Sequence, residues 1–364
     1  MALFSRNSFS EAQILDALRT VQEPELGGDL VSRKMIQNVV ISGDKVSFAI
    51  ELTTPACPLK HEIRTSCEEA LTRIAGVAID NITIEFTAQV KPRGGIIDKA
   101  AIPGVSHVIA VSAGKGGVGK STVAVNLATA LAREGAKVGL LDADIYGPSI
   151  PLMMGVTGQP EAEPGPDGQP RMIPLQAHGI KLMSVGFLVD ESQPVIWRGP
   201  MVSQLLRQFL YQVDWAPLDY LIIDMPPGTG DIALTLAQSL QNVGLTGAVT
   251  VTTPQQVAAI DVVKSMEMFR KVNVPLLGLI ENMAYFIAPD TGARYDIFGS
   301  GAAAGLGERL GVPLLGQIPL GMSIRAGGDD GRPAVLSDNQ DAYAEVFRTI
   351  AQRLAARVSV LENV

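Results

Sequence analysis

The chain contains, at residues 114–122, the run Gly114-Lys115-Gly116-Gly117-Val118-Gly119-Lys120-Ser121-Thr122. This run matches the spacing G-x-x-x-x-G-K-[S/T]. Apolar residues predict a strand over 108–112 just before it, and helical spacing predicts a helix over 120–133 just after it. A glycine-rich loop between a strand and a helix lets backbone amides surround phosphate oxygens. The run therefore predicts a P-loop that binds a nucleoside triphosphate, with a ligand-free glycine turn as the alternative.

The residues of the predicted loop have different expected roles. All of residues 114–122 are candidate nucleotide-binding residues, because the amides of such a loop face the phosphates. We expect Lys120 to reach the β- and γ-phosphates and to be catalytic, Ser121 to bind Mg²⁺ through its hydroxyl, and Thr122 to contact the α-phosphate. The N-terminus of the following helix adds partial positive charge. ATP and Mg²⁺ are therefore the expected ligands.

Carboxylates follow two other predicted strands, 138–141 and 220–223. Asp142 and Asp144 follow the first strand, and Asp224 follows the second. In open α/β sheets, ligands bind at the carboxyl ends of the strands. Asp224 is therefore expected to hold Mg²⁺ through a water molecule, and Asp144 to orient the water that attacks the γ-phosphate. A turn or a helix cap is the alternative role for each carboxylate.

Strand and helix patterns alternate over the larger part of the chain, from residue 106 to residue 360. Repeated alternation predicts an α/β fold with a mostly parallel, doubly wound sheet and helices on both faces. The predicted strands are 108–112, 138–141, 220–223, 248–251, 277–280 and 312–317, and the predicted helices are 120–133, 231–240, 254–272 and 341–358. Residues 158–170 are rich in Pro, Gly and Glu and are expected to form a surface loop or hairpin.

A small α+β domain is predicted over residues 8–90, ahead of the P-loop ATPase domain at 106–360. Its expected helices run from Ser10, as N-cap, to Val21 and over 59–74, and its expected strands are 39–41, 46–52 and 82–86. Residues 91–105 begin with Lys91-Pro92-Arg93-Gly94-Gly95 and are the expected linker.

The composition is that of a globular chain, with 364 residues, 47% of them hydrophobic and 18% charged. A formal net charge of −8 disfavours non-specific nucleic-acid binding, which needs clustered Lys and Arg. Residues 1–9 contain no apolar signal segment, and no apolar run reaches the roughly 18 residues of a transmembrane helix. We expect a cytoplasmic protein that binds neither nucleic acid nor membranes.

Lys115 gives the loop a second lysine that an ordinary P-loop does not need. The resulting pattern K-G-G-x-G-K-[S/T] resembles the deviant Walker A loop of the MinD/ParA-type ATPases. The resemblance implies that Lys115 reaches across a homodimer interface to the partner's nucleotide and is catalytic there, so that hydrolysis requires dimerisation. The alternative is that Lys115 serves its own subunit or is solvated.

Further motifs resemble the Mrp/ApbC branch of that family, the iron–sulfur cluster carriers. In the ATPase domain they are Asp144-Ile145-Tyr146-Gly147-Pro148-Ser149, Trp197-Arg198-Gly199-Pro200-Met201, residues 224–231 and Glu281-Asn282-Met283-Ala284. In the small domain, Glu23-Pro24-Glu25-Leu26, Asp29-Leu30-Val31 and residues 52–59 resemble an iron–sulfur-assembly domain. The resemblance implies that Asn282 hydrogen-bonds the adenine; a turn residue after a strand is its alternative role.

The chain departs from this family at the expected cluster ligands. Members that carry a cluster usually have C-x-x-C after the Asn-Met-Ala stretch, so that two subunits hold a bridging [4Fe–4S] cluster through four thiolates. Here the stretch reads Ala288-Pro289-Asp290-Thr291, and Tyr295 to Gly299 still keep the family's register. Neither Ala288 nor Thr291 offers a thiolate, so the bridging site lacks its ligands.

The two cysteines of the chain are Cys57 and Cys67. Cys57 precedes a predicted helix, and a helix N-terminus can lower the pKa of a thiol, which favours metal binding. Cys57 is therefore a candidate iron ligand, with a small buried apolar residue as the alternative. Cys67 lies on a predicted helix face and is expected in the core.

The leading functional hypothesis is an ATP-hydrolysing iron–sulfur cluster carrier or assembly factor that works as a nucleotide-gated homodimer with iron–sulfur client proteins. The alternative is a dimeric ATPase switch that recruits or positions cargo without binding a cluster. A third hypothesis is a P-loop kinase or synthetase that acts on a small molecule. Residues 150–200 contain no motif that indicates a substrate site for such an enzyme.

Overall fold

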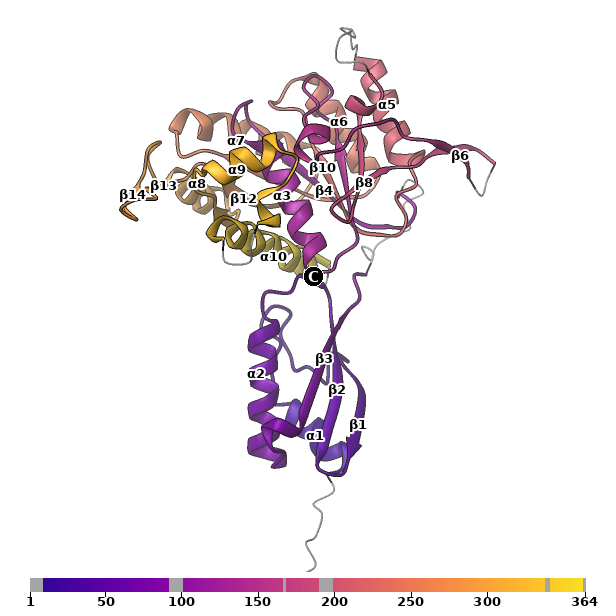
Figure 1. Cartoon of the computed structure of the whole chain (residues 1–364), viewed down its shortest axis with the longest axis vertical. Helices are drawn as coiled ribbons and strands as arrows, with labels where there is room; N and C mark the ends of the chain where they lie inside the picture. The colour runs from indigo at the N-terminus through magenta and orange to yellow at the C-terminus, as the bar shows by residue number, and fades with distance from the viewer. Residues whose placement is uncertain (1–8, 92–100, 166–167, 190–198, 338–340, 363–364) are drawn as a thin grey trace, which may run out of the picture. The chain divides into compact units, whose positions relative to one another are not determined.

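The computed structural model describes residues 9–91, 101–165, 168–189, 199–337 and 341–362. It comprises two compact units, residues 1–91 with 355–364 and residues 92–354, called here the small and the large unit (Figure 1). The expected linker at 91–105 falls largely on residues 92–100, which lie outside the described residues.

The small unit is a three-stranded sheet with two helices. Strand β2 pairs antiparallel with β1 and parallel with β3, in the order β1-β2-β3. Its elements are α1 (Glu11–Leu18), β1 (Ile36–Ser42), β2 (Lys45–Leu52), α2 (Lys60–Ala70) with a π-helical continuation (Leu71–Ala75), a 3₁₀ turn (Ile79–Asn81) and β3 (Ile82–Ala88). Its core contains Ile14, Leu18, Phe48, Ile50, Ile63 and Leu71.

Ser10 caps helix α1 as predicted. The Gln13 amide donates to Ser10 Oγ at 3.3 Å, and the Ser10 amide donates to Gln13 Oε1 at 2.9 Å, which satisfies two donors of the first turn. The helix ends at Leu18 rather than at Val21. The Thr20 hydroxyl donates to the Ala17 carbonyl at 2.7 Å and so satisfies an acceptor that a longer helix would use.

The large unit is built on an eight-stranded sheet within the described residues. Its order is β15-β12-β11-β4-β10-β5-β9-β8, and every neighbouring pair is parallel except β8 with β9. The strands are β4 (Val105–Ala113), β5 (Val138–Asp142), β8 (Leu175–Ala177), β9 (Ile180–Ser184), β10 (Leu218–Asp224), β11 (Leu245–Thr252), β12 (Leu276–Glu281) and β15 (Leu314–Gln317). The predicted mostly parallel α/β sheet is confirmed.

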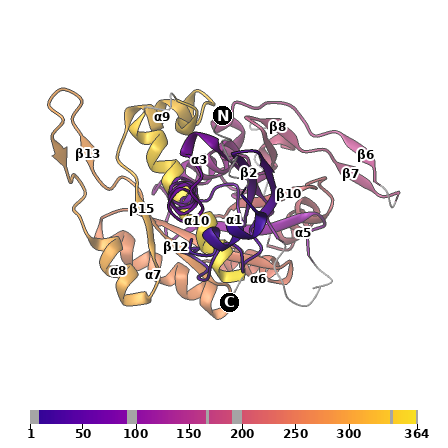
Figure 2. The same ribbon diagram turned by 90° about the horizontal axis from the view of Figure 1, so that it is seen from below.

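Helices cover both faces of this sheet (Figure 2). One face carries α3 (Lys120–Arg133) and the first turns of α10 (Ala342–Glu362), whose Ile350 packs against Gly316 of β15. The other face carries α5 (Gly199–Tyr211), α6 (Asp231–Asn242), α7 (Gln256–Lys271) and α8 (Ala302–Leu310). Shorter helical segments are α4 (Ile150–Met153), α9 (Met322–Asp329) and 3₁₀ turns at Val185–Phe187 and Ala334–Leu336.

Several elements were not predicted from the sequence. Strands β8 and β9 and helices α8 and α9 are short or interrupted by glycine, which weakens their periodicity. Helix α5 was not predicted either, although it is neither short nor interrupted by glycine. The expected hairpin within 158–170 is confirmed in outline, because β6 (Ala162–Pro164) pairs antiparallel with β7 (Pro170–Met172). A second hairpin joins β13 (Phe286–Ile287) to β14 (Arg294–Tyr295). Among the described residues, no helix is both long and apolar enough to cross a bilayer.

Candidate nucleotide-binding site

The glycine-rich loop lies at the centre of the large sheet. Strand β4, between β11 and β10, ends at Ala113, and helix α3 begins at Lys120. Gly117 and Gly119 have φ values of +79° and +81°, a backbone conformation that residues with a side chain rarely adopt. The loop therefore closes over the N-terminus of α3, where the helix dipole favours an anion.

Two other contacts leave no room for a side chain in the loop. A Cβ at Gly114 would lie 2.3 Å from the carbonyl carbon of Asp261 in α7. A Cβ at Gly119 would lie 2.1 Å from Nδ2 of Asn282, which follows β12. The loop is thus packed between helix α7 and the end of strand β12. Glycine is required at Gly114 by space, and at Gly119 by its positive φ as well as by the nearby Asn282 side chain.

Lys120 and Ser121 both contact Asp224 at the end of β10. Lys120 Nζ donates to Asp224 Oδ1 at 2.6 Å, and Ser121 Oγ donates to Asp224 Oδ2 at 2.6 Å. Asp144 Oδ2 lies 3.5 Å from Lys120 Nζ on the other side. The structure therefore brings together four of the residues that the sequence singled out, Lys120, Ser121, Asp144 and Asp224.

A third carboxylate, Asp142, is fully buried beside this group. Strands β5 and β10 align Asp142 with Asp224. Asp142 accepts hydrogen bonds from Ser184 Oγ at 3.0 Å, the Asp144 amide at 3.1 Å and the Ile150 amide at 3.3 Å. It thereby holds both ends of the loop that carries Asp144. The sequence contained no signal for Ser184, because strand β9 was not predicted.

Burial raises the pKa values of all three carboxylates, and Lys120, the lysine beside them, offsets this only in part. Burial, and then the charge of Asp224, raise the pKa of Asp142 to about 8. Burial also raises the pKa of Asp144 and of Asp224, and the positive charge of Lys120 opposes both shifts. A divalent cation near Ser121 and Asp224 would reduce the excess negative charge, and hard carboxylate and hydroxyl oxygens are the donors that Mg²⁺ prefers.

The shifted pKa of Asp142 predicts that stability falls as the pH rises. The ordinary pKa of an unfolded Asp is about 3.9, so between about pH 4 and pH 8 the folded chain holds a proton that the unfolded chain has released. The unfavourable contribution of Asp142 to the free energy of unfolding is absent below about pH 4 and is complete above about pH 8. Asp142→Asn removes it, at a cost in hydrogen bonding that does not vary with pH.

We therefore expect the variant to gain stability relative to the wild type from pH 5 to pH 8, by at most about 1.4 kcal/mol per pH unit for one proton. Urea unfolding at several pH values in EDTA measures this difference. Asp80→Asn, at an exposed carboxylate, is the matched control and is expected to show no such slope. A difference between Asp142→Asn and wild type that is constant with pH would contradict the prediction.

An apolar cavity of about 610 Å³ adjoins the loop. Its walls come from α3, the segment after β12, and the segment from Pro319 to α9, and they include Gly119, Thr122, Asn282, Pro319, Leu320 and Met322. Asn282 lies at the loop end of the cavity, where its Nδ2 donates to the Val118 carbonyl at 2.9 Å. A cavity of this size and polarity can hold a planar base. The contribution of α9 was not foreseen, because that helix was not predicted.

Lys115 lies in the loop with its side chain half-buried. It makes no hydrogen bond or ion pair with a residue that the structure describes. The motif residues Trp197 and Arg198 lie outside the described residues, and Gly199 to Met201 begin helix α5.

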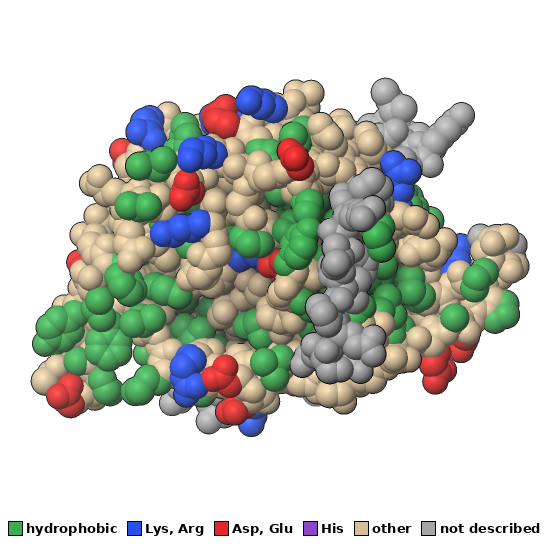
Figure 3. All heavy atoms as spheres, turned by 90° about the horizontal axis from the view of Figure 1, so that it is seen from above, with side chains coloured by type: hydrophobic (Ala, Val, Ile, Leu, Met, Phe, Trp, Pro, Cys, Tyr) green, Lys and Arg blue, Asp and Glu red, His purple; other side chains and the backbone are tan. Residues whose placement is uncertain are grey.

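The segment where cluster ligands were expected forms the tip of the β13–β14 hairpin. The Ala288 amide donates to the Ala293 carbonyl at 2.9 Å, and the Gly292 amide donates to the Ala288 carbonyl at 2.8 Å. Thr291 Oγ1 accepts from the Ala293 amide at 3.3 Å. The tip is thus closed by its own hydrogen bonds. Apolar side chains gather near it, at the lower left of Figure 3, and the exposed ones include Ile287, Tyr295 and Ile297.

The expectation that Cys57 has a lowered pKa is wrong. The side chain is 7% exposed in the core of the small unit, and burial raises its pKa to about 11. The helix begins only at Lys60, so its partial charge does not offset the loss of hydration. Cys67 is fully buried in the same core, as predicted, with its pKa raised to about 12 by burial. Within the described ranges, no three His, Cys, Asp or Glu side chains form a group that could hold a metal ion.

The parallel sheet, the glycine-rich loop and the acidic strand ends define a P-loop nucleotide-binding protein. The family model described as NUBPL iron-transfer P-loop NTPase matches residues 104–355, and one described as iron-sulfur cluster assembly protein matches residues 11–84. The chain belongs to this family of iron-transfer P-loop NTPases, which confirms its resemblance to the iron–sulfur cluster carriers.

Similar proteins cover almost the whole chain. A protein of Synechocystis called iron-sulfur cluster carrier protein is 50% identical over 95% of this chain and 97% of its own length. A protein of the same name from Escherichia coli K12 is 45% identical over 95% of this chain and 92% of its own length. The structure of an Archaeoglobus fulgidus nucleotide-binding protein in complex with ADP is 35% identical, with a TM-score of 0.56 over 68% of this chain and 98% of that one.

Proposed function

We propose that the large unit binds ATP with Mg²⁺ at loop 114–122 and hydrolyses it. The observation that carries the proposal is the contact of Lys120 Nζ and Ser121 Oγ with the two oxygens of Asp224, each at 2.6 Å. A lysine suited to bind phosphate and two oxygen groups suited to Mg²⁺ therefore lie together at the N-terminus of α3, which supports the proposal. The ADP complex of the Archaeoglobus relative supports a nucleotide at this loop.

The chain's own residues would divide the chemistry as follows. Lys120 binds the β- and γ-phosphates and stabilises charge in the transition state. Ser121 and, through water, Asp224 hold Mg²⁺, which neutralises phosphate charge when bound. Asp144, held in place by Asp142, orients the attacking water. The apolar cavity takes the base, with Asn282 at its polar end.

Hydrolysis in this proposal requires a homodimer. Lys115 has a half-buried side chain that no described residue pairs with, and its position in the loop resembles that of a lysine acting on a partner's nucleotide. A cation delivered in trans stabilises the transition state only when two subunits close. The ATP cycle would therefore be coupled to dimer closure.

We propose that this cycle serves the transport or assembly of an iron–sulfur cluster for client proteins in the cytoplasm. The names of the Synechocystis and Escherichia coli relatives and the match of the small unit to a cluster-assembly family support this use. The alternative is an ATPase that recruits cargo without binding a cluster. The self-closed turn at Ala288 to Ala293, which offers no thiolate, favours that alternative.

Anaerobic reconstitution separates the two uses. The purified protein is incubated with iron and sulfide, desalted, and its bound iron and sulfide are measured for wild type, Cys57→Ala and Cys67→Ala. A direct carrier is expected to retain a cluster, and Cys57→Ala to lose it if local opening exposes that thiol, while Cys67→Ala serves as the matched core control. A wild type that retains no cluster would rule out direct carriage and leave the recruiting ATPase.

A further inference from the structure

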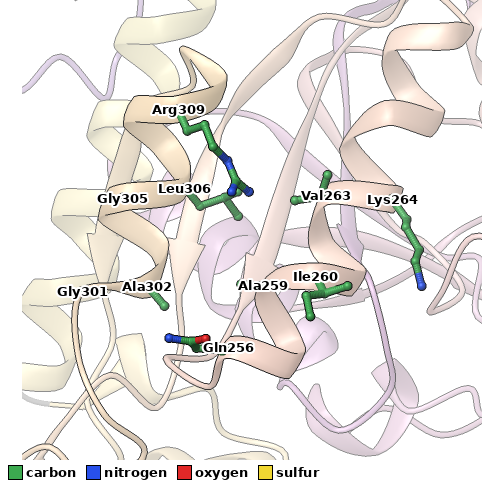
Figure 4. Close-up of a pocket in the computed structure, with 10 residues that line it drawn as sticks. All are labelled: Gln256, Ala259, Ile260, Val263, Lys264, Gly301, Ala302, Gly305, Leu306 and Arg309. Carbon is green, nitrogen blue, oxygen red and sulfur yellow. The ribbon is translucent and has the colours of Figure 1, made fainter.

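Helices α7 and α8 form the walls of an open groove on the outer surface of the large unit (Figure 4). Its volume is about 660 Å³. The α7 wall presents positions 256, 259, 260, 263 and 264, and the α8 wall presents 301, 302, 305, 306 and 309. Each set repeats at helical spacing, so one face of each helix is turned to the groove.

The floor of the groove is apolar, with Leu306 buried, Ala259 and Val263 half-buried, and Ile260 exposed at its edge. Ala259, Val263 and Leu306 line it, and Ile260 is 61% exposed beside them. Val257, which lies three residues before Ile260 on α7, is 66% exposed. Exposed aliphatic side chains that are contiguous in this way mark interaction surfaces on soluble proteins more often than scattered ones do.

Gly305 widens the groove in the middle of α8. A Cβ at this position would meet no atom within 4 Å, so packing inside the chain does not require glycine there. Glycine inside a helix costs about 1 kcal/mol relative to alanine. Gly305 therefore leaves the backbone of α8 open to close approach from outside the chain.

The charge of the groove is positive. Arg309 extends from α8 across the gap toward α7, whereas Lys264 points outward from the far side of α7, where it pairs with Asp261 (Figure 4). Arg309 forms no ion pair with a described residue, and no carboxylate is among the residues that line the groove. In a chain with a net charge of −8, this local cation over an apolar floor selects a partner with an acidic group.

The walls also restrict the backbone of the partner. Every lining residue belongs to a helix or its N-cap, so no strand edge offers backbone donors or acceptors. A segment buried in the groove must satisfy its own backbone hydrogen bonds, which an α-helix does. The α7 wall spans positions 256 to 264, or about 12 Å at 1.5 Å per residue, which matches about two turns of helix.

We infer that the α7–α8 groove is a docking site for an acidic amphipathic helix of a partner protein. Aliphatic residues of that helix contact Ile260, Val263 and Leu306. A stretch of the partner helix packs closely against the α8 backbone at Gly305, and a Glu or Asp of the partner pairs with Arg309. This surface lies apart from the nucleotide site, so the inference holds whether or not the chain hydrolyses ATP.

Binding of two designed peptides tests the inference. Both are fluorescein-labelled helical peptides with leucines at i, i+3, i+4 and i+7; one carries Glu beside this stripe and the other carries Lys. Fluorescence anisotropy with the full chain is expected to show binding of the Glu peptide only. Arg309→Glu is expected to weaken this binding about tenfold or more and to allow binding of the Lys peptide.

A second variant tests the shape of the groove. Gly305→Leu fills the groove while improving the helix propensity of α8. The variant is therefore expected to fold but no longer to bind the Glu peptide. Ala304→Leu, exposed on another face of α8, and Lys137→Glu, exposed before β5, are the matched controls and are expected to bind as the wild type does.

Three outcomes overturn the inference: no binding of the Glu peptide, equal binding of both peptides, or binding that survives Arg309→Glu or Gly305→Leu. Sedimentation of the same variants shows whether a second copy of the chain occupies the groove instead, in which case Gly305→Leu shifts the oligomeric state. ATP turnover of each variant is measured alongside, so that a failure of the proposed ATPase is seen separately from a failure of docking.

Discussion

Lys120→Met is expected to reduce ATP turnover about 100- to 1,000-fold, as the loss of one preorganised donor does in other active sites. The Lys120 side chain is only 6% exposed and lies 2.6 Å from Asp224 and 3.5 Å from Asp144, at the N-terminus of α3 where the phosphates are expected. The substitution also leaves buried carboxylates without their counter-charge, which destabilises the chain.

Two measurements separate these effects of Lys120→Met. Steady-state phosphate release reports turnover, and thermal unfolding with and without ATP and Mg²⁺ reports stability and nucleotide binding. Lys137→Met, which removes an exposed lysine before β5, is the matched control. Turnover of Lys120→Met within threefold of the wild type would be incompatible with a phosphate role for this lysine.

Lys115→Ala is expected to lower turnover by about 10³-fold or more, the range found for cations delivered in trans to a phosphoryl-transfer site. Binding of ATP is expected to change little, because the half-buried Lys115 makes no hydrogen bond or ion pair with a described residue of its own site. Turnover of the wild type is expected to rise more steeply than linearly with protein concentration, since only dimers would be active. Unchanged turnover in Lys115→Ala would rule out the catalytic role.

Mixing the two variants distinguishes action in trans from action in cis. A Lys115→Ala chain keeps its own Lys120, and a Lys120→Met chain keeps its own Lys115. If Lys115 acts across the interface, each mixed dimer regains one working site, and an equal mixture regains about a quarter of wild-type turnover by random pairing. If Lys115 acts within its own subunit, the mixture stays as inactive as its components.

The parts of the site that depend on local patterns could be predicted from the sequence. The spacing from Gly114 to Thr122 between a strand and a helix indicated the loop, and the strand pattern before Asp224 placed a carboxylate at the same sheet edge. Parallel pairing of β10 with β4 and β5 then brings Asp224 to the loop. Such inferences hold because strand direction and sheet edge follow from the alternation of strands and helices.

Features that depend on burial or on distant segments could not be predicted. The pKa of Cys57 is set by the apolar core around it, whereas the sequence shows only the neighbouring helix. Ser184 reaches Asp142 from β9, a five-residue strand with little periodicity. Gly305 faces a groove whose opposite wall lies some forty residues earlier along the chain. In each case the deciding neighbour is distant in sequence.

The contact of Gly114 with helix α7 has a mechanical consequence. Because the backbone of Gly114 lies so close to the backbone at Asp261 and Val262 that a Cβ would not fit between them, a shift of the loop towards α7 would press directly on that helix. The same helix supplies one wall of the α7–α8 groove through Ile260 and Val263. A phosphate that displaced the loop would thus move the groove wall, and by reciprocity a helix seated there would act on the affinity for phosphate.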